Sequence, residues 1–226
     1  MSLWRAPRRL RAGGRCRGGA GLEAFCLRRS PGAAISPSAL APIMTARSTP
    51  ATGLIERSLF RPHWLIPKGE YLTLLSSGFM HADVMHLLFN AFTFWAFAFG
   101  LERAIGSERF FWLYAVGLLA SDLGTWMRHR HQPEYRTLGA SGAITAVLFA
   151  AIVYFPNGSI FILPIPVPIP SPLFALAYLA YTWFAARRPD GGINHDAHLS
   201  GALAGIAFVA LTDGAAIARA WQQVAG

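Results

Sequence analysis

The chain has 226 residues, of which 54% are hydrophobic and only 14% are charged. This composition argues against a water-soluble domain, because several stretches have too few polar residues for a water-facing surface, and it indicates a membrane protein. The net charge of +9 does not indicate nucleic-acid binding, because nine of the 20 basic residues lie in the first 53 positions and no nucleic-acid-binding motif accompanies them.

The first 53 residues are predicted to form a disordered arm. They contain nine Arg and a single acidic residue, Glu23, and such a segment buries too little apolar surface to fold alone. The composition also resembles an organelle transit peptide. A start codon assigned too far upstream, with Met44 as the internal start, would give the same composition. Cys16 and Cys26, the only cysteines, lie in this arm and indicate neither a disulfide framework nor a metal site.

A membrane domain is predicted over residues 54 to 214. Residues 54 to 80 are amphipathic, with aromatic and basic residues interleaved, which favours an interfacial element. Apolar stretches follow that approach the roughly 20 residues needed to cross a ~30 Å hydrocarbon core. They lie at 84–101, 110–127, 137–155, 172–186 and 197–212. The fold class is therefore an all-α polytopic membrane protein, with a helical bundle of five spans and a C-terminal tail at 215–226.

The prolines at 164, 166, 168, 170 and 172 limit the fourth span. Each proline removes a backbone donor and fixes φ, so an α-helix does not run through them. The sequence predicts an extended loop at the membrane edge, with the helix beginning near Pro172.

Polar residues gather where the odd-numbered spans begin. The third span opens with Ser141, the fifth with His198, and the first carries His86 and Asn90. These spans run parallel, since one crossing separates each from the next, so the residues reach the same membrane face. His86 and Asn90 are four residues apart and hence lie on one helical face.

These residue types suit nucleophilic catalysis. Ser141 is a poor nucleophile at its free pKa, and His198 can act as the base that activates it. His86, Asn90 and the backbone N–H of Ser141 are candidate donors to the oxyanion that then develops.

Glycines support this arrangement. Gly139 and Gly142 leave the backbone around Ser141 open to close approach. Gly201 and Gly205 continue from Ala197 at four-residue spacing, a small-residue face that predicts close packing of the fifth span on the third.

The motifs are similar to those of the rhomboid family of intramembrane serine proteases. Residues 81–90 match its H-x4-H-x3-N element, 139–142 its G-x-S-G motif, and 197–205 its A-H-x2-G-x3-G motif. The resemblance covers about residues 59–211.

The resemblance implies roles for five residues. Ser141 becomes the nucleophile and His198 the general base, with His86 and Asn90 as oxyanion donors and His81 in support. It also implies cleavage of transmembrane segments of other membrane proteins near their ends, within the lipid bilayer and without cofactor or metal. The alternative is a non-catalytic rhomboid-like protein that binds client helices.

Two features depart from the family pattern. The family's first helix is missing from this sequence, which fits a start-site or frameshift artefact, a truncation, or a protein completed by another chain. Lys and Arg number 17 on the Ser141 side and 3 on the other, so the positive-inside rule favours a cytoplasmic catalytic face. The family's usual orientation places that face outside, and we expect the family's orientation here. We expect a multi-pass protein of a bacterial inner membrane, or alternatively of an organelle inner membrane.

Overall fold

The computed structural model describes residues 50–162, 165–188 and 192–225. Most of the predicted N-terminal arm, with Cys16, Cys26 and Met44, lies outside the described residues. The first described helix, α2, begins at Pro50 and so crosses the predicted boundary between arm and membrane domain at residue 54.

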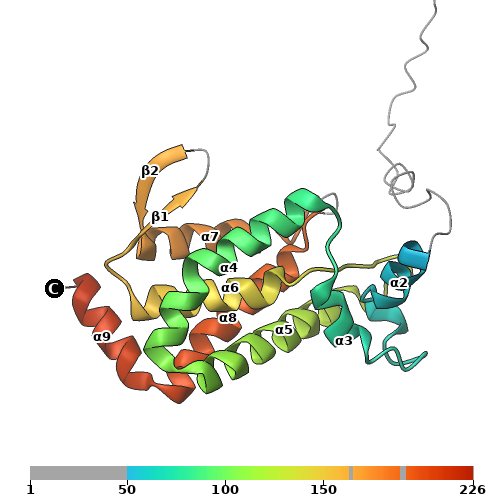
Figure 1. Cartoon of the computed structure of the whole chain (residues 1–226), viewed down its shortest axis with the longest axis horizontal. Helices are drawn as coiled ribbons and strands as arrows, with labels where there is room; N and C mark the ends of the chain where they lie inside the picture. Colours follow the sequence, from blue (N-terminus) through green and yellow to red (C-terminus); the bar gives the residue numbers. More distant parts are fainter. Residues whose placement is uncertain (1–49, 163–164, 189–191, 226) are drawn as a thin grey trace, which may run out of the picture. The chain divides into compact units, whose positions relative to one another are not determined.

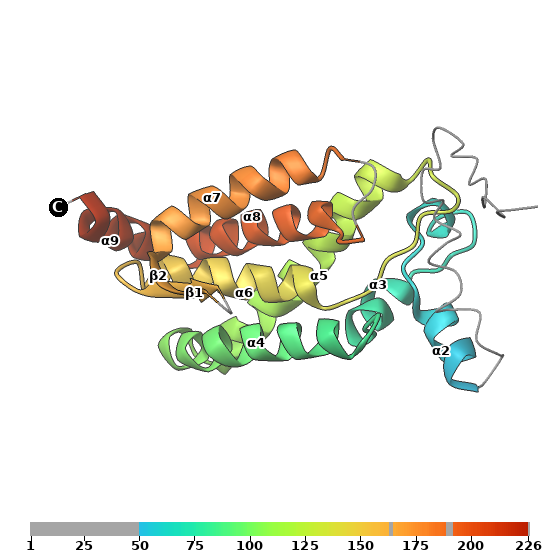
Figure 2. The ribbon, with the colours of Figure 1, turned by 90° about the horizontal axis from the view of Figure 1, so that it is seen from above.

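Five long helices occupy the five predicted apolar stretches. They are α4 (Val84–Ile105), α5 (Ser107–His129), α6 (Ser141–Tyr154), α7 (Ser171–Ala185) and α8 (His195–Thr212). Figures 1 and 2 show them side by side, with α4 inclined to the others in Figure 1, and α6 and α8 run the same way. The prediction of a helical membrane bundle is confirmed.

Length and hydropathy alone identify fewer spans than five. Within the described residues, α4 and α5 are long and apolar enough to cross a membrane. A third span results if α8 and the helix after it, α9 (Gly214–Ala225), are counted as one broken span, whereas α6 is a shorter apolar helix. The five crossings therefore stay a prediction, while the five helices are observed.

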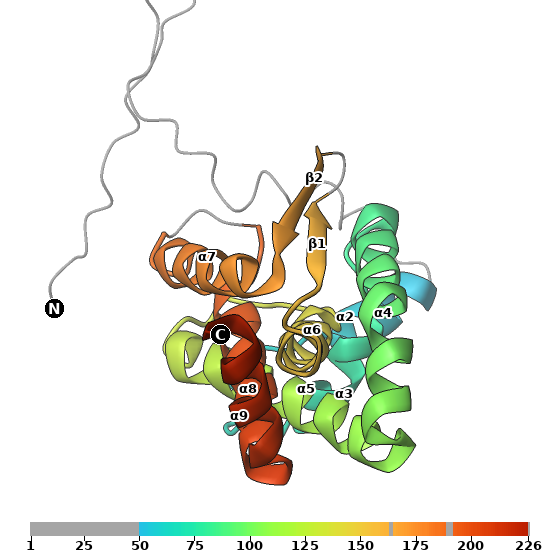
Figure 3. The ribbon, with the colours of Figure 1, turned by 90° about the vertical axis from the view of Figure 1, so that its left-hand side faces the viewer.

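Helix α6 forms the centre of the bundle. Every residue from Gly142 to Ile152 is buried, and a helix that is apolar on all sides belongs inside a bundle rather than on its surface. In Figure 3, which looks along the bundle, α6 lies between α4, α5, α7 and α8. Ser141, its first residue, is thereby held at the centre of one end of the bundle.

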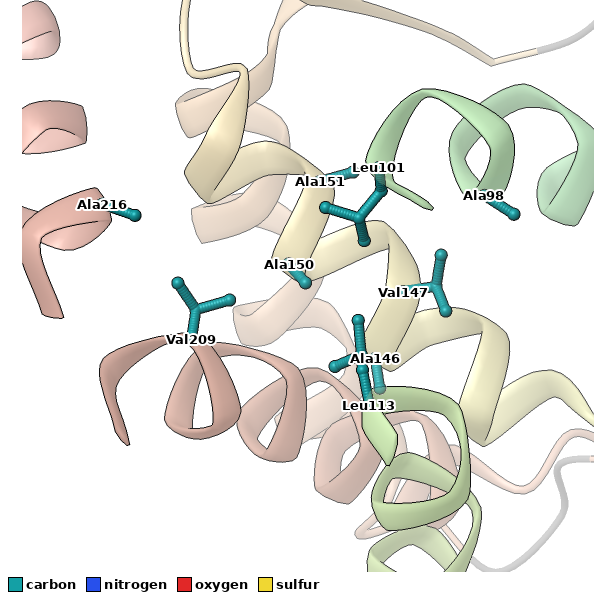
Figure 4. Close-up of a cluster of buried hydrophobic side chains, with 9 residues drawn as sticks. All are labelled: Ala98, Leu101, Leu113, Ala146, Val147, Ala150, Ala151, Val209 and Ala216. Carbon is teal, nitrogen blue, oxygen red and sulfur yellow. The ribbon is translucent and has the colours of Figure 1, made fainter. Parts of the chain in front are cut away.

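Small residues let the helices approach α6 closely. The main cluster of buried side chains, drawn in Figure 4, joins five helices and is rich in alanine. A Cβ on Gly201 would overlap the carbonyl group of Gly142, and one on Gly205 would overlap the backbone of Ala146. The small-residue face of α8 therefore meets α6, as its spacing predicts.

The proline run is an extended segment, but it is paired rather than a free loop. Strand β2 (Ile165–Pro170) pairs antiparallel with β1 (Ser159–Ile162), and Ile160 faces Ile169. N–H groups of alternate strand residues point to the same edge, so the non-proline residues of β2 direct their donors towards β1 while the prolines need none. This alternation explains how a strand forms where a helix does not.

The predicted interfacial stretch folds into short helices. They are α2 (Pro50–Ser58), η2 (Pro62–Trp64), α3 (Thr73–Ser76) and η3 (Ser77–Phe79). Arg61 donates to Glu70 at 3.0 and 2.6 Å, which closes this segment on itself. Leu72 and Phe79 are 81% and 76% exposed, in keeping with the predicted position at the membrane interface.

We predict that Gly201→Ala destabilises the protein. The added methyl group forces α8 away from the Gly142 carbonyl, and overpacking of this kind costs about 1–3 kcal/mol. Thermal unfolding in detergent measures the effect. Gly100→Ala is the matched control, since a Cβ on Gly100 of α4 meets nothing within 4 Å. Equal unfolding temperatures for the two variants would contradict the close packing.

Candidate active site

Ser141 and His198 are in direct contact. Ser141 opens α6, His198 lies in the first turn of α8, and Nε2 of the imidazole is 2.9 Å from the serine Oγ. This is hydrogen-bond distance, and it joins residues 57 positions apart in the chain. The arrangement allows the imidazole to accept the hydroxyl proton.

The loop before α6 fixes the position of Ser141. Thr137 exchanges two backbone hydrogen bonds of 2.9 Å with Phe60, and the N–H of Gly139 donates to the Ser77 carbonyl at 2.9 Å. Gly139 has a φ of +119°, which side-chain-bearing residues rarely adopt. The interfacial segment thus holds the chain that delivers the serine.

Gly139 lies close to both Ser141 and the His86 ring. A Cβ on Gly139 would lie 3.0 Å from His86 Nε2 and 3.9 Å from Ser141 Oγ, so the ring and the hydroxyl both lie close to the space that a side chain at this position would fill. The Ala82 N–H donates to His86 Nδ1 at 3.4 Å, so Nε2 is the ring nitrogen that remains to donate.

Asn90 and the Ser141 backbone carry two further donors. Asn90 is buried on α4, one turn after His86, and its Nδ2 has no hydrogen-bond partner among the described residues. The N–H of Ser141 belongs to the first turn of α6, where backbone donors have no partner within the helix. Unused donors at the positive end of a helix suit a developing anion.

His81 forms a second ring beside His86. The two rings meet edge to face with centroids 5.2 Å apart. Burial and the nearby His86 lower the pKa of His81, so this ring is neutral at pH 7. A neutral ring adds no positive charge next to His86.

Asn194, which the sequence motifs do not single out, positions the start of α8. Its Oδ1 accepts from the Ala197 N–H at 3.0 Å, while its Nδ2 donates to Thr125 at 2.9 Å and to Thr137 at 3.2 Å. One side chain therefore caps α8 and ties it to α5 and to the loop before Ser141. An asparagine before a helical pattern is a signal for such a cap.

Asp196, the acidic residue nearest in sequence to His198, is hydrogen-bonded to a different histidine. Asp196 accepts from His129 Nε2 at 2.9 Å, and the His129 ring stacks on Tyr135 at 3.6 Å. Burial and the Asp196 charge raise the pKa of Tyr135, so its hydroxyl stays neutral. Among the described residues no hydrogen bond joins a carboxylate to His198, so serine and histidine form a dyad.

Helix α7 contributes two rings that spacing did not reveal. Tyr178 lies beside His198, with centroids 6.5 Å apart, and Tyr181 meets His195 edge to face at 5.4 Å. Tyrosines three residues apart on α7 thus face histidines three residues apart on antiparallel α8. The sequence alone does not show that these rings meet, because a spacing of three residues is common on any helix. The contact becomes visible only when α7 is seen packed against α8.

Gly142 allows three helices to meet just below the dyad. A Cβ there would overlap Ser121 of α5 and lie 3.1 Å from the Ala197 carbonyl of α8.

The described residues contain no group of three or more His, Cys, Asp or Glu side chains arranged to hold a metal ion.

Comparison with known families agrees with these motifs. The family model for the Rhomboid domain matches residues 68–213, which include all three motifs. The chain belongs to the rhomboid family. This family includes serine intramembrane proteases.

Individual relatives are similar over part of their length. Rhomboid protein 1, mitochondrial, of Saccharomyces cerevisiae is 28% identical over 156 residues, 66% of this chain and 45% of the yeast protein. Presenilin-associated rhomboid-like protein, mitochondrial, of Homo sapiens is 30% identical over 162 residues, 69% and 42% of the two chains. YdcA of Bacillus subtilis, provisionally named a rhomboid protease, is 35% identical over 95 residues, 41% and 46%. The chain thus spans less than half the length of these relatives.

We predict that Asn194→Ala destabilises the fold by about 1–2 kcal/mol, because α8 loses its cap and both threonines lose a donor. Thermal unfolding in detergent measures this. Asn194→Asp keeps the acceptor for Ala197 but lacks the N–H donors, so it should fall between the wild type and Asn194→Ala. An alanine variant as stable as the wild type would contradict the bracing role.

Proposed function

We propose that the protein is an intramembrane serine endopeptidase that cleaves transmembrane segments of other membrane proteins with the Ser141–His198 dyad. The observation that carries the proposal is the 2.9 Å between His198 Nε2 and Ser141 Oγ. The His86 ring close to Gly139 and the Nδ2 of Asn90, which is one turn further along α4 and unpartnered among the described residues, support it. Family membership supports it independently. Gly139, Gly142, Gly201 and Gly205 act in support, by admitting the close approaches that the site needs.

Acylation follows from the positions of these atoms. Ser141 Oγ attacks the scissile carbonyl carbon while His198 Nε2 takes the hydroxyl proton, and the carbonyl oxygen becomes an oxyanion. The donors on His86, Asn90 and the Ser141 backbone stabilise it, and each such donor typically contributes roughly 2.7–4 kcal/mol. His198 then gives its proton to the amide nitrogen, the C–N bond breaks, and the amine product leaves.

Deacylation regenerates the enzyme. His198 takes a proton from a water molecule, the resulting hydroxide adds to the ester carbonyl, and the proton returns to Ser141 as the carboxylic acid product departs. The carbonyl oxygen accepts hydrogen bonds from the same donors in acylation and in deacylation. No step needs a cofactor or a metal.

The substrate class follows from the surroundings of the dyad. The protein is an integral membrane protein, and the dyad lies at one end of the apolar, buried helix α6. A peptide bond that reaches Ser141 from the side of the bundle comes from a segment that already resides in the bilayer. Because the dyad lies at the end of α6 and not at its middle, the bond that is cut should lie near one end of the transmembrane segment.

The membrane in which the protein resides is part of the proposal. The relatives from yeast and human carry "mitochondrial" in their names, and the expected bacterial inner membrane gains no support from them. We therefore favour the alternative, an organelle inner membrane, which also agrees with the transit-like composition of the first 53 residues.

We predict that Ser141→Ala abolishes labelling by a fluorophosphonate probe and cleavage of a transmembrane reporter substrate. The full chain in detergent is compared with a rhomboid protease of known activity. Ser200→Ala is the matched control, because Ser200 lies two residues from His198 but faces Gly124 of α5. It should be labelled like the wild type.

The same experiment separates the two candidate functions. If the probe labels the control protease but leaves the wild-type chain unlabelled, the dyad is not activated and the proposal fails. Co-purification of client helices, unchanged by Ser141→Ala, would then favour the non-catalytic function.

We also predict that Tyr178 positions His198. Its ring lies beside the imidazole and packs on Phe149 and Phe174. Tyr178→Leu removes the ring and should lower kcat about tenfold with little change in KM, whereas Tyr178→Phe keeps the ring and should stay close to the wild type. Phe174→Leu controls for lost aromatic packing away from the imidazole. Equal kcat values for Tyr178→Leu and the wild type would exclude the positioning role.

A further inference from the structure

Helix α9 (Gly214–Ala225) lies across the end of the bundle opposite Ser141. It is bent by 110° from α8, and Figure 3 shows it crossing in front of that end. Helix α8 has 18 residues, so at 1.5 Å per residue it is about 27 Å long, close to the ~30 Å of a hydrocarbon core. If α8 crosses the bilayer, α9 begins at its far surface and runs along the membrane plane.

The side chains of α9 divide into two faces. Ile217, Trp221 and Val224 follow one another at four- and three-residue spacing, whereas Arg219 and Gln222 lie away from them. Ile217 packs against the main buried cluster, but Trp221 and Val224 are 70% and 50% exposed. An apolar stripe that starts in the bundle therefore continues beyond it.

The direction of α9 is fixed by Asp213, which stands between the two helices. Its Oδ1 accepts from the Ala216 N–H at 3.1 Å, and its Oδ2 accepts from the Tyr154 hydroxyl at 3.0 Å and from Arg219 at 3.2 Å. The hydrogen bond from Tyr154 is the main reason that the pKa of Asp213 is lowered, so the carboxylate is charged at pH 7. The last residue of α6 thus holds the bend.

Burial supports the same fixed direction. Ala216 is 2% exposed and belongs to the core cluster of Figure 4, so the first turn of α9 is part of the bundle. With 12 residues, α9 is about 18 Å long and too short to cross a bilayer. It is a braced helix with an uncovered apolar stripe.

We propose that α9 is an interfacial anchor, in which Ile217, Trp221 and Val224 insert into the boundary between lipid headgroups and acyl chains on the side opposite the dyad. Tryptophan favours this depth, and a short amphipathic helix parallel to the surface buries its apolar face there. Because α9 is braced to α6 and α8, its contact with lipid sets the depth of both helices in the bilayer. The proposal does not depend on catalysis at Ser141.

Site-directed spin labelling tests the anchor. In the full chain with Cys16→Ser and Cys26→Ser, single cysteines replace Trp221 or Val224 on the stripe, and Ala215 or Gln222 on the other side as matched controls. Each labelled protein is placed in phosphatidylcholine–phosphatidylglycerol vesicles. Electron paramagnetic resonance then measures collisions with oxygen, which concentrates in lipid, and with a neutral nickel chelate, which stays in water.

The anchor predicts that labels at 221 and 224 collide more with oxygen and labels at 215 and 222 more with nickel. The label at 224 leaves Trp221 in place, so it reports on the helix with its tryptophan present. Equal nickel collisions at all four positions would place α9 in water and overturn the proposal. Protection of 221 and 224 from both reagents would mean that protein covers the stripe, which also overturns it.

A second variant tests the brace. Asp213→Ala removes the acceptor shared by Tyr154, Ala216 and Arg219, so the difference between the two faces should shrink and the labels should become more mobile. Tyr154→Phe removes one of the three bonds and should have a smaller effect. An unchanged pattern in Asp213→Ala would show that Asp213 does not hold the bend.

Discussion

The close approach of α6 and α8 is the constraint on which the candidate site depends. Gly201 rests on the Gly142 carbonyl and Gly205 on the Ala146 backbone, so the two helices are fixed in separation and in register. Ser141 precedes Gly142 by one residue, and His198 precedes Gly201 by three. The hydrogen-bond distance between hydroxyl and imidazole is therefore a consequence of helix packing just below it, and it needs no carboxylate to hold the ring.

The two ends of the bundle use polar groups differently. At the Ser141 end, Asn90 keeps a buried donor without a partner among the described residues, which is costly in an apolar environment and is retained where a ligand can use it. At the other end, Asp213 satisfies three donors and holds α9 at an angle to α8. Helix α6, which is buried from Gly142 to Ile152, joins the ends, so the candidate dyad and the proposed anchor lie at opposite ends of the bundle.

Several parts of the fold could be predicted from the spacing of residue types along the sequence, because these parts depend on residues that are close together in the chain. Apolar runs predicted all five long helices, and the prolines predicted the break before α7. The small residues of α8 predicted a close helix contact. The pairing of the proline run as β2, and the helix at 214–225, were not predicted, since a strand needs a partner edge and a short amphipathic helix needs a surface.

The sequence by itself determined the membrane class, the family motifs and the identity of the candidate dyad and donors, because these follow from composition and from residues a few positions apart. Only the tertiary structure decided that Asp196 turns to His129 rather than to His198, that Asn194 braces three segments, and that Tyr178 lies beside the imidazole. These contacts depend on how each helix is rotated about its axis and which helix it faces. Spacing along one helix does not contain that information, because it is set by packing between residues that are far apart in the chain.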